Sequence, residues 1–263
     1  MNLIQINDIS IPELSIYKNL RDGAFSADNS FIADSPKVVN ILLKTQIKVK
    51  SILATQEYYD EFGDLLKSKD IASLYVTSKE QMQNIVGHKI HHNCMLHGIR
   101  PQNAALEDLG ESIVMLDNIT SSENVGSIAR SMAALGIDSY LLPNTSPHPF
   151  NRRALRVSMG HSSYLNISIY EDIKETILLL KRRGYRVYAA EVQENSTPLN
   201  DVKVTQKWVL LMGHEGKGIS PEILELCDEV VTIEMKEGIK SFNVSVAASI
   251  MMYKFINSVN ITS

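Results

Sequence analysis

Strand-like and helix-like segments alternate along the second half of the chain, and this alternation restricts the fold more than any other feature. Apolar runs of strand character occur at residues 113–117, 139–142, 164–170, 186–190, 208–212 and 230–233. Helical patterns separate them at 124–135, 151–159, 172–183, 221–227 and 243–256, and glycines stand where two of these helices should end, at Gly136 and Gly184. Strands that alternate with helices predict a mostly parallel sheet covered on both faces.

A separate, smaller α/β unit is expected in the first half. Pro36 suits the first turn of a helix, and strands are expected at 49–55 and 73–77. Helices are expected at 57–69 and, after a capping Ser78, at 79–85. Residues 98–105 are polar and lack apolar periodicity, so the domain boundary is placed here. The predicted domains are residues 1–105, with a flexible start, and 106–263.

Composition fits a protein with a packed core. The 263 residues are 44% hydrophobic, with a formal net charge of -4 and a pI near 6.0. No apolar run approaches the roughly 20 residues of a membrane span, and the N-terminus lacks the pattern of a signal peptide. We therefore expect a cytoplasmic protein with no membrane partner. Its two cysteines, Cys94 and Cys227, are far apart in sequence and are expected to be reduced thiols.

The positions of the basic residues bear on nucleic acid binding more than the acidic net charge does. One basic cluster comprises Arg152, Arg153 and Arg156, and another comprises Lys181, Arg182, Arg183 and Arg186. Such clusters are also typical of a solvated surface. Four histidines lie near Cys94, at His88, His91, His92 and His97. No carboxylate or cysteine pattern completes a zinc site there, so we expect no metal.

Three strand ends of the second domain carry residues suited to ligand binding. They are Asn124, Gly126 and Arg130 in the first turn, Gly213, Glu215 and Gly218 in the second, and Ser241 and Asn243 in the third. Glycines allow close approach of the backbone to a ligand, and helix starts expose N–H groups. Ligands bind outside the carboxyl ends of parallel strands. Taken singly, however, each turn also fits an ordinary helix cap or glycine-rich turn.

The second turn does not match two common nucleotide-binding patterns. It is not a Walker A loop, because Lys217 is followed by Gly218 and not by Ser or Thr. It is not a dinucleotide fingerprint, because it comes late in the chain and no matching acidic residue follows. A nucleotide-dependent oxidoreductase is therefore a weak alternative.

Taken in order, the three turns resemble the signature motifs of the SpoU (TrmH-like) family of RNA ribose 2′-O-methyltransferases, in the SPOUT superfamily. The family's first pattern is Asn-x-Gly-x-x-x-Arg, which here is Asn124, Gly126 and Arg130. Its second is Gly-x-Glu-x-x-Gly, here Gly213, Glu215 and Gly218. Its third is Ser-Leu-Asn-Val-Ser, which corresponds to residues 241–245. The resemblance covers about Ser112 to Ile256, and residues 1–105 match the family's substrate-binding domain more loosely. Phe242 replaces the usual Leu, Glu234 stands where Pro is common, and Lys240 precedes Ser241.

The resemblance implies a parallel α/β domain with a deep trefoil knot, a homodimer, and S-adenosylmethionine as cofactor. The implied cofactor contacts are Gly213, Gly218, Ile233, Met235 and Phe242. The implied catalytic residues are Arg130, Asn124, Glu215, Ser241 and Asn243. In related enzymes the counterpart of Arg130 is the proposed base, although arginine is effectively always protonated. Arg130 is therefore either a base assisted by an RNA phosphate or a charged clamp on that phosphate.

Geometry and domain content refine these expectations. Six helical residues turn about 600°, so Asn124 and Arg130 cannot share one face, and we expect Asn124 in the loop before the helix. Glu215 is expected to fix either Arg130 or the loop. The expected partner is RNA, ribosomal rather than transfer RNA because compact transfer-RNA enzymes often lack an N-terminal domain, with Arg152, Arg153 and Arg156 on its backbone. The alternatives are transfer RNA, or a catalytically silent RNA-binding homologue.

Overall fold

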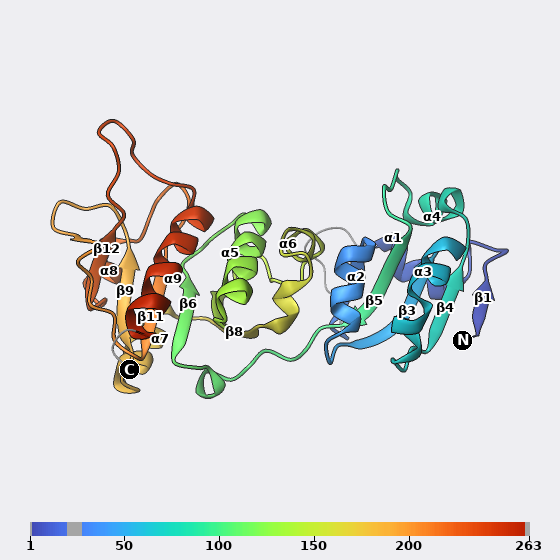
Figure 1. Ribbon diagram of the computed structural model, residues 1–263, viewed down its shortest axis with the longest axis horizontal. Helices are drawn as coiled ribbons and strands as arrows, with labels where there is room; N and C mark the ends of the chain where they lie inside the picture. The colour runs from blue at the N-terminus through green and yellow to red at the C-terminus, as the bar shows by residue number, and fades with distance from the viewer. Residues whose placement is uncertain (1, 20–27, 261–263) are drawn as a thin grey trace. The chain divides into compact units, whose positions relative to one another are not determined.

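The computed structural model describes residues 2–19 and 28–260, and these form two compact units (Figure 1). The first unit is Met1–Gln102 with Phe150–Ser163, and the second is Asn103–Pro149 with Tyr164–Ser263. The break after Gln102 comes slightly before the boundary expected at residue 105. The expected flexible start includes Met1 and residues 20–27, which lie outside the described residues. Residues 150–163 belong to the first unit although their flanking strands belong to the second.

The first unit is built on a mixed five-stranded sheet in the order β1-β4-β3-β5-β2. Its strands are β1 (Leu3–Gln5), β2 (Ser30–Asp34), β3 (Lys48–Ala54), β4 (Ser73–Val76) and β5 (Cys94–Ile99). β5 runs antiparallel to both β3 and β2, while β1, β4 and β3 are parallel. Its helices are α1 (Ser15–Asn19), α2 (Pro36–Leu43), α3 (Gln56–Lys67), α4 (Lys79–Val86) and α6 (Arg152–Val157).

The predicted elements of this unit are confirmed within two residues, but the strands β1, β2 and β5 and the short helix α1 were missed. Helix α2 begins at Pro36, and the Ser78 hydroxyl accepts a hydrogen bond from the Gln81 amide (3.2 Å) as the cap of α4. The expectation that residues 98–105 form only a linker is wrong, because Gly98 and Ile99 belong to β5. Gly98 interrupts the apolar pattern for a steric reason, since a Cβ there would lie 2.8 Å from the Phe31 ring.

The second unit contains a seven-stranded sheet in the order β10-β12-β9-β11-β6-β7-β8, and every described pairing is parallel. Its strands are β6 (Ser112–Leu116), β7 (Ser139–Pro143), β8 (Asn166–Tyr170), β9 (Arg186–Ala190), β10 (Thr197–Pro198), β11 (Trp208–Met212) and β12 (Glu229–Thr232). Its helices are α5 (Ser122–Leu135), α7 (Ile173–Arg182), α8 (Pro221–Leu224) and α9 (Val244–Asn260). The parallel-sheet prediction is thus confirmed, and Gly136 and Gly184 follow α5 and α7 with φ values of 74° and 86°.

Helices cover both faces of this sheet. On one face, α7 and α8 contribute Ile177, Leu180, Ile223 and Leu224 to a core shared with buried strand residues. On the other face, α5 and α9 pack against each other (Figure 1). Phe255 of α9 stacks edge-on against Trp208 and Tyr188, with ring centroids 5.3 and 5.0 Å apart. No helix in the described part of the chain is long and apolar enough to cross a membrane.

The parallel arrangement brings several functional turns to one edge of the sheet. β12, β9, β11 and β6 are consecutive neighbours, so the residues that follow them leave the sheet at the same carboxyl edge. Those residues are Asp117, Glu191, Gly213 and Ile233.

Candidate active site

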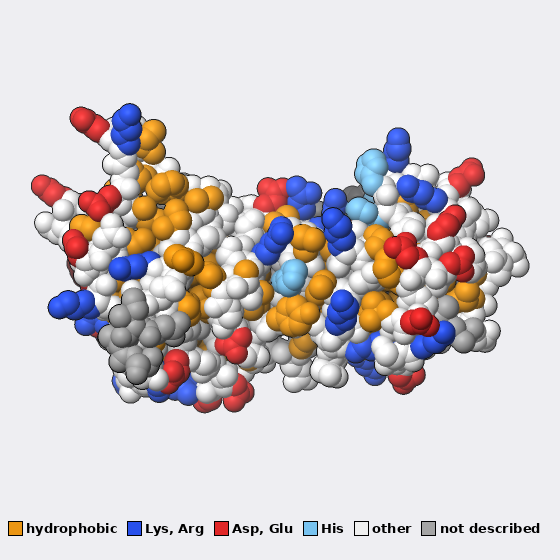
Figure 2. Space-filling view, viewed as in Figure 1, with side chains coloured by type: hydrophobic (Ala, Val, Ile, Leu, Met, Phe, Trp, Pro, Cys, Tyr) orange, Lys and Arg blue, Asp and Glu red, His pale blue; other side chains and the backbone are white. Residues whose placement is uncertain are grey.

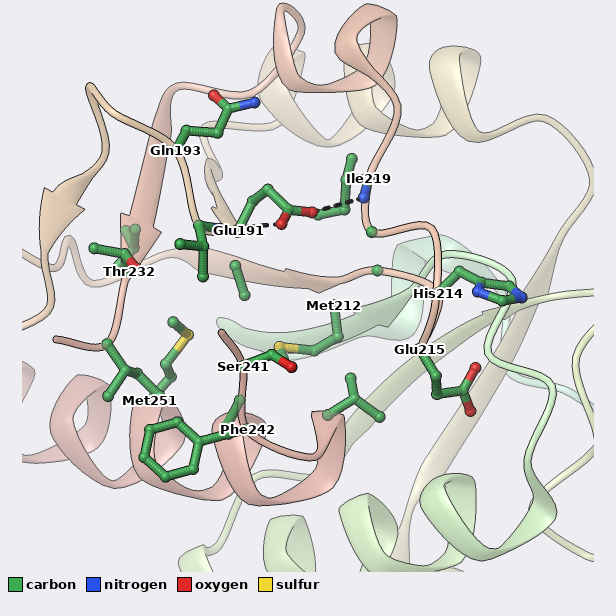
Figure 3. A pocket seen from close by; sticks show the side chains of 18 of the residues that line it. Glu191, Gln193, Met212, His214, Glu215, Ile219, Thr232, Ser241, Phe242 and Met251 are labelled. Atoms are coloured by element: carbon green, nitrogen blue, oxygen red, sulfur yellow. Dashed lines mark hydrogen bonds between the residues drawn. The ribbon is translucent and has the colours of Figure 1, made fainter. Parts of the chain in front are cut away.

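A cavity of about 430 Å³ opens at this carboxyl edge, between the ends of β9, β11 and β12 and the start of α9 (Figure 3). Its volume lies within the range of roughly 300–1,000 Å³ typical of small-molecule sites. All five predicted cofactor residues line it, namely Gly213, Gly218, Ile233, Met235 and Phe242. Two of the predicted catalytic residues, Glu215 and Ser241, line it as well.

One wall of the cavity is apolar. Met212, Ile233, Val244 and Met251 contribute to it, and Phe242 adds an aromatic ring that is 42% exposed. Figure 3 shows the side chains of Met212, Phe242 and Met251 around this wall, with the Ser241 hydroxyl near Met212. Such a wall suits a flat heterocycle, because aromatic and aliphatic side chains bury ring surface without requiring hydrogen bonds.

The opposite wall is the glycine-rich turn over residues 213–219. The His214 carbonyl accepts the Gly218 amide (2.9 Å), and His214 Nδ1 accepts the amides of Gly216 (2.9 Å) and Lys217 (3.2 Å). A Cβ on Gly213 would lie 2.6 Å from Ile219 Cγ1. The turn is therefore folded closely on itself, and only glycine fits at its start.

Glu215 joins the second motif to the first. Its carboxylate accepts hydrogen bonds from the backbone amides of Thr120 (3.3 Å) and Ser121 (3.2 Å) and from the side-chain amide of Asn124 (2.9 Å). These donors stand at the N-terminus of α5, where the helix dipole favours negative charge. Of the two expected partners of Glu215, the structure therefore shows the loop and not Arg130.

Asn243 joins the third motif to the same network. Its side-chain nitrogen donates to Asn124 Oδ1 (3.1 Å), while its Oδ1 accepts from the Ser245 amide (2.9 Å) and hydroxyl (2.6 Å). Asn124 thus lies between Glu215 and Asn243 and bonds to both. Three turns that are remote in sequence meet through these three side chains.

The expected position of Asn124 is wrong, and Arg130 lies apart from the cavity. Helix α5 begins at Ser122 and is capped by the Ser121 hydroxyl, which places Asn124 inside the helix, where it is buried. The helical twist separates the two side chains, as calculated, and Arg130 is exposed. Within residues 2–19 and 28–260, no hydrogen bond or ion pair involves its guanidinium, and it does not line the cavity.

Comparison with known proteins settles the family. The profile described as "SpoU rRNA Methylase family" matches residues 111–253, which is more than half of the chain and contains all three turns. The chain belongs to the SpoU family. Over 229 residues it is 28% identical to an uncharacterized tRNA/rRNA methyltransferase of Mycobacterium tuberculosis, covering 85% of this chain and 79% of that protein.

Solved structures share the fold across both units of this SpoU chain. An AdoMet-bound rRNA methyltransferase from Sinorhizobium meliloti matches with a TM-score of 0.82 at 19% identity, over 97% of this chain and 98% of that one. The SpoU methyltransferase AviRb from Streptomyces viridochromogenes, in complex with AdoMet, matches with a TM-score of 0.79 at 18% identity, over 96% and 100%. At these identities the likeness establishes the fold alone.

Two carboxyl groups at the carboxyl edge of the sheet, those of Glu215 and Asp117, have shifted pKa values. Burial tends to raise the pKa of Glu215, but the hydrogen bonds from Asn124, Thr120 and Ser121 outweigh it and hold the pKa below its usual value. Burial raises the pKa of Asp117, which follows β6, and the hydrogen bond from the Asn118 side chain (2.8 Å) only partly offsets this. Glu215 is thus a stable anion at neutral pH.

Several cavity residues were not predicted from the SpoU motifs. Glu191, Gln193, Thr232, His214 and Met251 all line it. Glu191 and Thr232 stand at the carboxyl ends of β9 and β12, so the strand-end rule would have indicated them. Met251 lies two turns into α9, and no local sequence pattern marks it.

The basic clusters contribute mainly to internal contacts. Arg152 donates from Nε (3.0 Å) and Nη2 (2.6 Å) to Asp34 Oδ2 and is 17% exposed, while the Asp34 carboxylate is nearly buried. Arg153 and Arg156 are exposed, although Arg156 Nε stands 3.6 Å from Asp34 Oδ1. In the second cluster, Lys181 pairs with Asp228 (2.9 Å) and Arg186 with Glu229 (3.0 Å).

For the part of the chain that the structure describes, no group of three or more potential metal ligands is found.

We predict that Asn124→Ala slows methyl transfer by about 10–100-fold, because it removes two hydrogen bonds, one of them to a carboxylate. Cofactor affinity should change by less than about threefold, since Asn124 does not line the cavity. Single-turnover methyl transfer and calorimetry measure the two quantities. Asn144→Ala, at an exposed asparagine in the same unit, is the control. Unchanged methyl transfer in Asn124→Ala would show that the network has no catalytic part.

The lowered pKa of Glu215 predicts how stability depends on pH. A carboxyl whose pKa is lower in the folded state stabilises the fold above its unfolded pKa, here about 4.5, and this contribution is lost as the pH falls through the folded value. The difference in unfolding free energy between wild type and Glu215→Gln should therefore be largest near pH 7 and should shrink below about pH 4. Urea unfolding at a series of pH values measures it, and a constant difference would contradict the prediction.

Proposed function

We propose that this SpoU protein transfers a methyl group to a ribose 2′-hydroxyl of RNA, and that its substrate is ribosomal RNA. One observation carries the proposal: Glu215, Asn124 and Asn243 join all three family motifs beside a single cavity. This arrangement supports the deep trefoil knot, which we keep as part of the proposal, because segments 213–219 and 233–242 line one cavity. The intact network of Glu215, Asn124 and Asn243 favours an active enzyme over a silent homologue.

The cofactor is S-adenosylmethionine, and the lining of the cavity fits it. The apolar wall of Ile233, Phe242 and Met251 suits the adenine ring. The turn that begins at Gly213 carries three glycines, at 213, 216 and 218, so a ligand can approach its backbone closely. Family members of similar fold are described as bound to AdoMet, which agrees with this assignment.

When bound, the cofactor supplies a methyl group already activated on a sulfonium. The remaining tasks fall to the chain, which must hold the ribose hydroxyl in line and assist loss of its proton. Ser241 lines the cavity, and Asn124 and Asn243 are fixed beside it by the Glu215 network. Holding the reacting groups in position lowers the activation free energy by several kcal/mol, and by roughly 7–11 kcal/mol at most.

In this proposal Arg130 is a charged clamp on an RNA phosphate. An exposed guanidinium stays protonated at any physiological pH, so it is well suited to hold an anion and poorly suited to accept a proton. Arg130 does not line the cavity of its own chain. This agrees with a homodimer in which the active site lies beside the interface between the two copies.

An apolar stripe on α9 supports the homodimer. Val246, Ile250 and Tyr253 share one side of the helix and are 45%, 36% and 64% exposed. Hydrophobic side chains gather over this part of the second unit (Figure 2). Helix α9 packs beside α5, which carries Arg130, so a second copy covering the stripe would lie next to both the cavity and that arginine.

The first unit is proposed to bind the RNA, through Arg153 and Arg156. Its separate sheet and helices favour a ribosomal over a transfer RNA substrate, as argued from the sequence. Arg152 is excluded from this role, because its guanidinium is committed to Asp34. We assign it instead to holding α6 in place through its two bonds to Asp34.

The function is tested by mapping 2′-O-methyl marks in RNA from cells with and without the gene, and by methyl transfer in vitro to the RNA so identified. We expect one ribosomal ribose to lose its mark, and activity to be strongly reduced in Arg130→Ala but partly retained in Arg130→Lys, which keeps the charge. If the lost mark lies in transfer RNA, the proposed substrate is wrong. If the lost methyl group is on a base, the proposed ribose 2′-O-methylation is wrong. Equal inactivity of both variants would contradict the clamp.

Replacement of Arg153 and Arg156 by alanine should weaken RNA binding and reduce its salt dependence. Each lost phosphate contact on single-stranded RNA lowers the slope of log K against log salt by about 0.7. Fluorescence anisotropy at several salt concentrations measures this. Arg152→Ala is the contrasting variant, because breaking its buried pair should lower the stability of the fold by about 3–5 kcal/mol. An unchanged salt slope in the double variant would place the RNA elsewhere.

A further inference from the structure

Glu191 is a charged residue of the cofactor cavity that belongs to none of the three motifs. It follows β9 and lies between the ends of β11 and β12, with its backbone amide bonded to the Val231 carbonyl (3.2 Å). Figure 3 shows its carboxylate directed at the backbone of the glycine-rich turn, on the opposite side of the cavity from the Glu215 side chain. The two carboxylates therefore hold different parts of the same turn.

The Glu191 carboxylate bonds to the end of that turn. Its Oε2 accepts the Ile219 amide (2.8 Å), and its Oε1 accepts the amide of Val192 (3.0 Å). A hydrogen bond to a charged acceptor is stronger than one between neutral groups. The bond from Ile219 therefore ties the last residue of the turn to the end of β9, across the floor of the cavity.

Gly218 makes this contact sterically feasible. Its φ is +64°, and a Cβ at this position would overlap Glu191 Oε2 and would lie 3.0 Å from Glu191 Cδ. Any side chain at residue 218 would therefore displace the carboxylate from the Ile219 amide. The glycine and the carboxylate depend on each other for a geometric reason that the motif pattern alone does not express.

We propose that Glu191 is a positioning residue that holds turn 213–219 in its cofactor-binding shape, and that Gly218 serves to admit its carboxylate. The inference rests on the cavity being the S-adenosylmethionine site and adds to it a residue outside the family motifs. Because Glu191 acts on the turn and not on the reacting atoms, it should affect cofactor binding and leave the transfer step unchanged.

A double-mutant cycle tests this coupling with S-adenosylmethionine binding by calorimetry as the readout. Glu191→Ala should weaken binding about tenfold, as expected for loss of one charge-assisted hydrogen bond. Gly218→Ala should weaken it about 100-fold, because the clash adds to the cost of a positive φ. The double variant should be about 100-fold weaker than wild type, since removal of the carboxylate removes the clash but leaves the roughly tenfold cost of the positive φ, whereas independent effects would multiply to about 1,000-fold.

Two further variants separate positioning from general stability. Glu191→Gln keeps an acceptor for the Ile219 amide and should bind within about threefold of wild type. Gly184→Ala is the matched control, because its φ is +86° but nothing lies within 4 Å of an added Cβ. It should lower the unfolding midpoint without changing cofactor affinity. For Glu191→Ala, KM for the cofactor should rise while kcat at saturation stays within about twofold.

The outcomes distinguish the positioning role of Glu191 from the assignment of the cavity as the S-adenosylmethionine site. If wild type binds the cofactor but the cycle is additive, or if Glu191→Gln is as weak as Glu191→Ala, the positioning role is wrong and the cofactor site stands. If wild type takes up no S-adenosylmethionine, the cavity assignment fails, and this inference fails with it.

Discussion

The carboxylate of Glu215, placed against the N-terminus of α5, is the interaction on which the rest of the site depends. Two backbone amides and the side chain of Asn124 converge on it from a segment about ninety residues away. These amides have no partner within the helix, so the carboxylate satisfies groups that would otherwise need water. The same bond orients Asn124, whose oxygen then receives Asn243. One anion thus fixes both the first motif and, through one amide, the third.

The parallel sheet makes this convergence possible. Strands β12, β9, β11 and β6 are neighbours, so chain segments far apart in sequence end at one edge. The strands lie in the core between the helices, with Trp208 and the rest of β11 buried, which leaves the turns at their ends free to take shapes suited to binding. Glycine at 213 then lets the turn fold closely onto Ile219, and glycine at 218 leaves room for the Glu191 carboxylate. Stability and binding are therefore divided between the strands and their ends.

Sequence reasoning succeeded where a pattern is local and failed where a contact is remote. Periodicity located six of the seven strands of the parallel sheet, all but the two-residue β10, and glycines marked the ends of α5 and α7. It missed the strands β1 and β2 and also β5, in which Gly98 makes room for Phe31. It placed Asn124 outside α5, because Ser121 and not Asn124 is the cap. Motif spacing selected residues that line one cavity but gave no sign of Glu191, whose partner lies 28 positions away. Partners brought together only by the fold cannot be read from spacing.

The arrangement of charge in the second unit separates two tasks. Both cavity carboxylates, Glu191 and Glu215, are bonded to backbone amides, so they shape the turn and are not free to take part in other chemistry. Arg130 stands exposed outside the cavity, on helix α5, which packs against α9. The residues that line the cavity thus come from one chain, while Arg130, the proposed phosphate clamp, is not among them. On the proposed function, the acceptor side of the site is completed only when RNA and a second copy of the chain are present, which would restrict methyl transfer to the assembled complex.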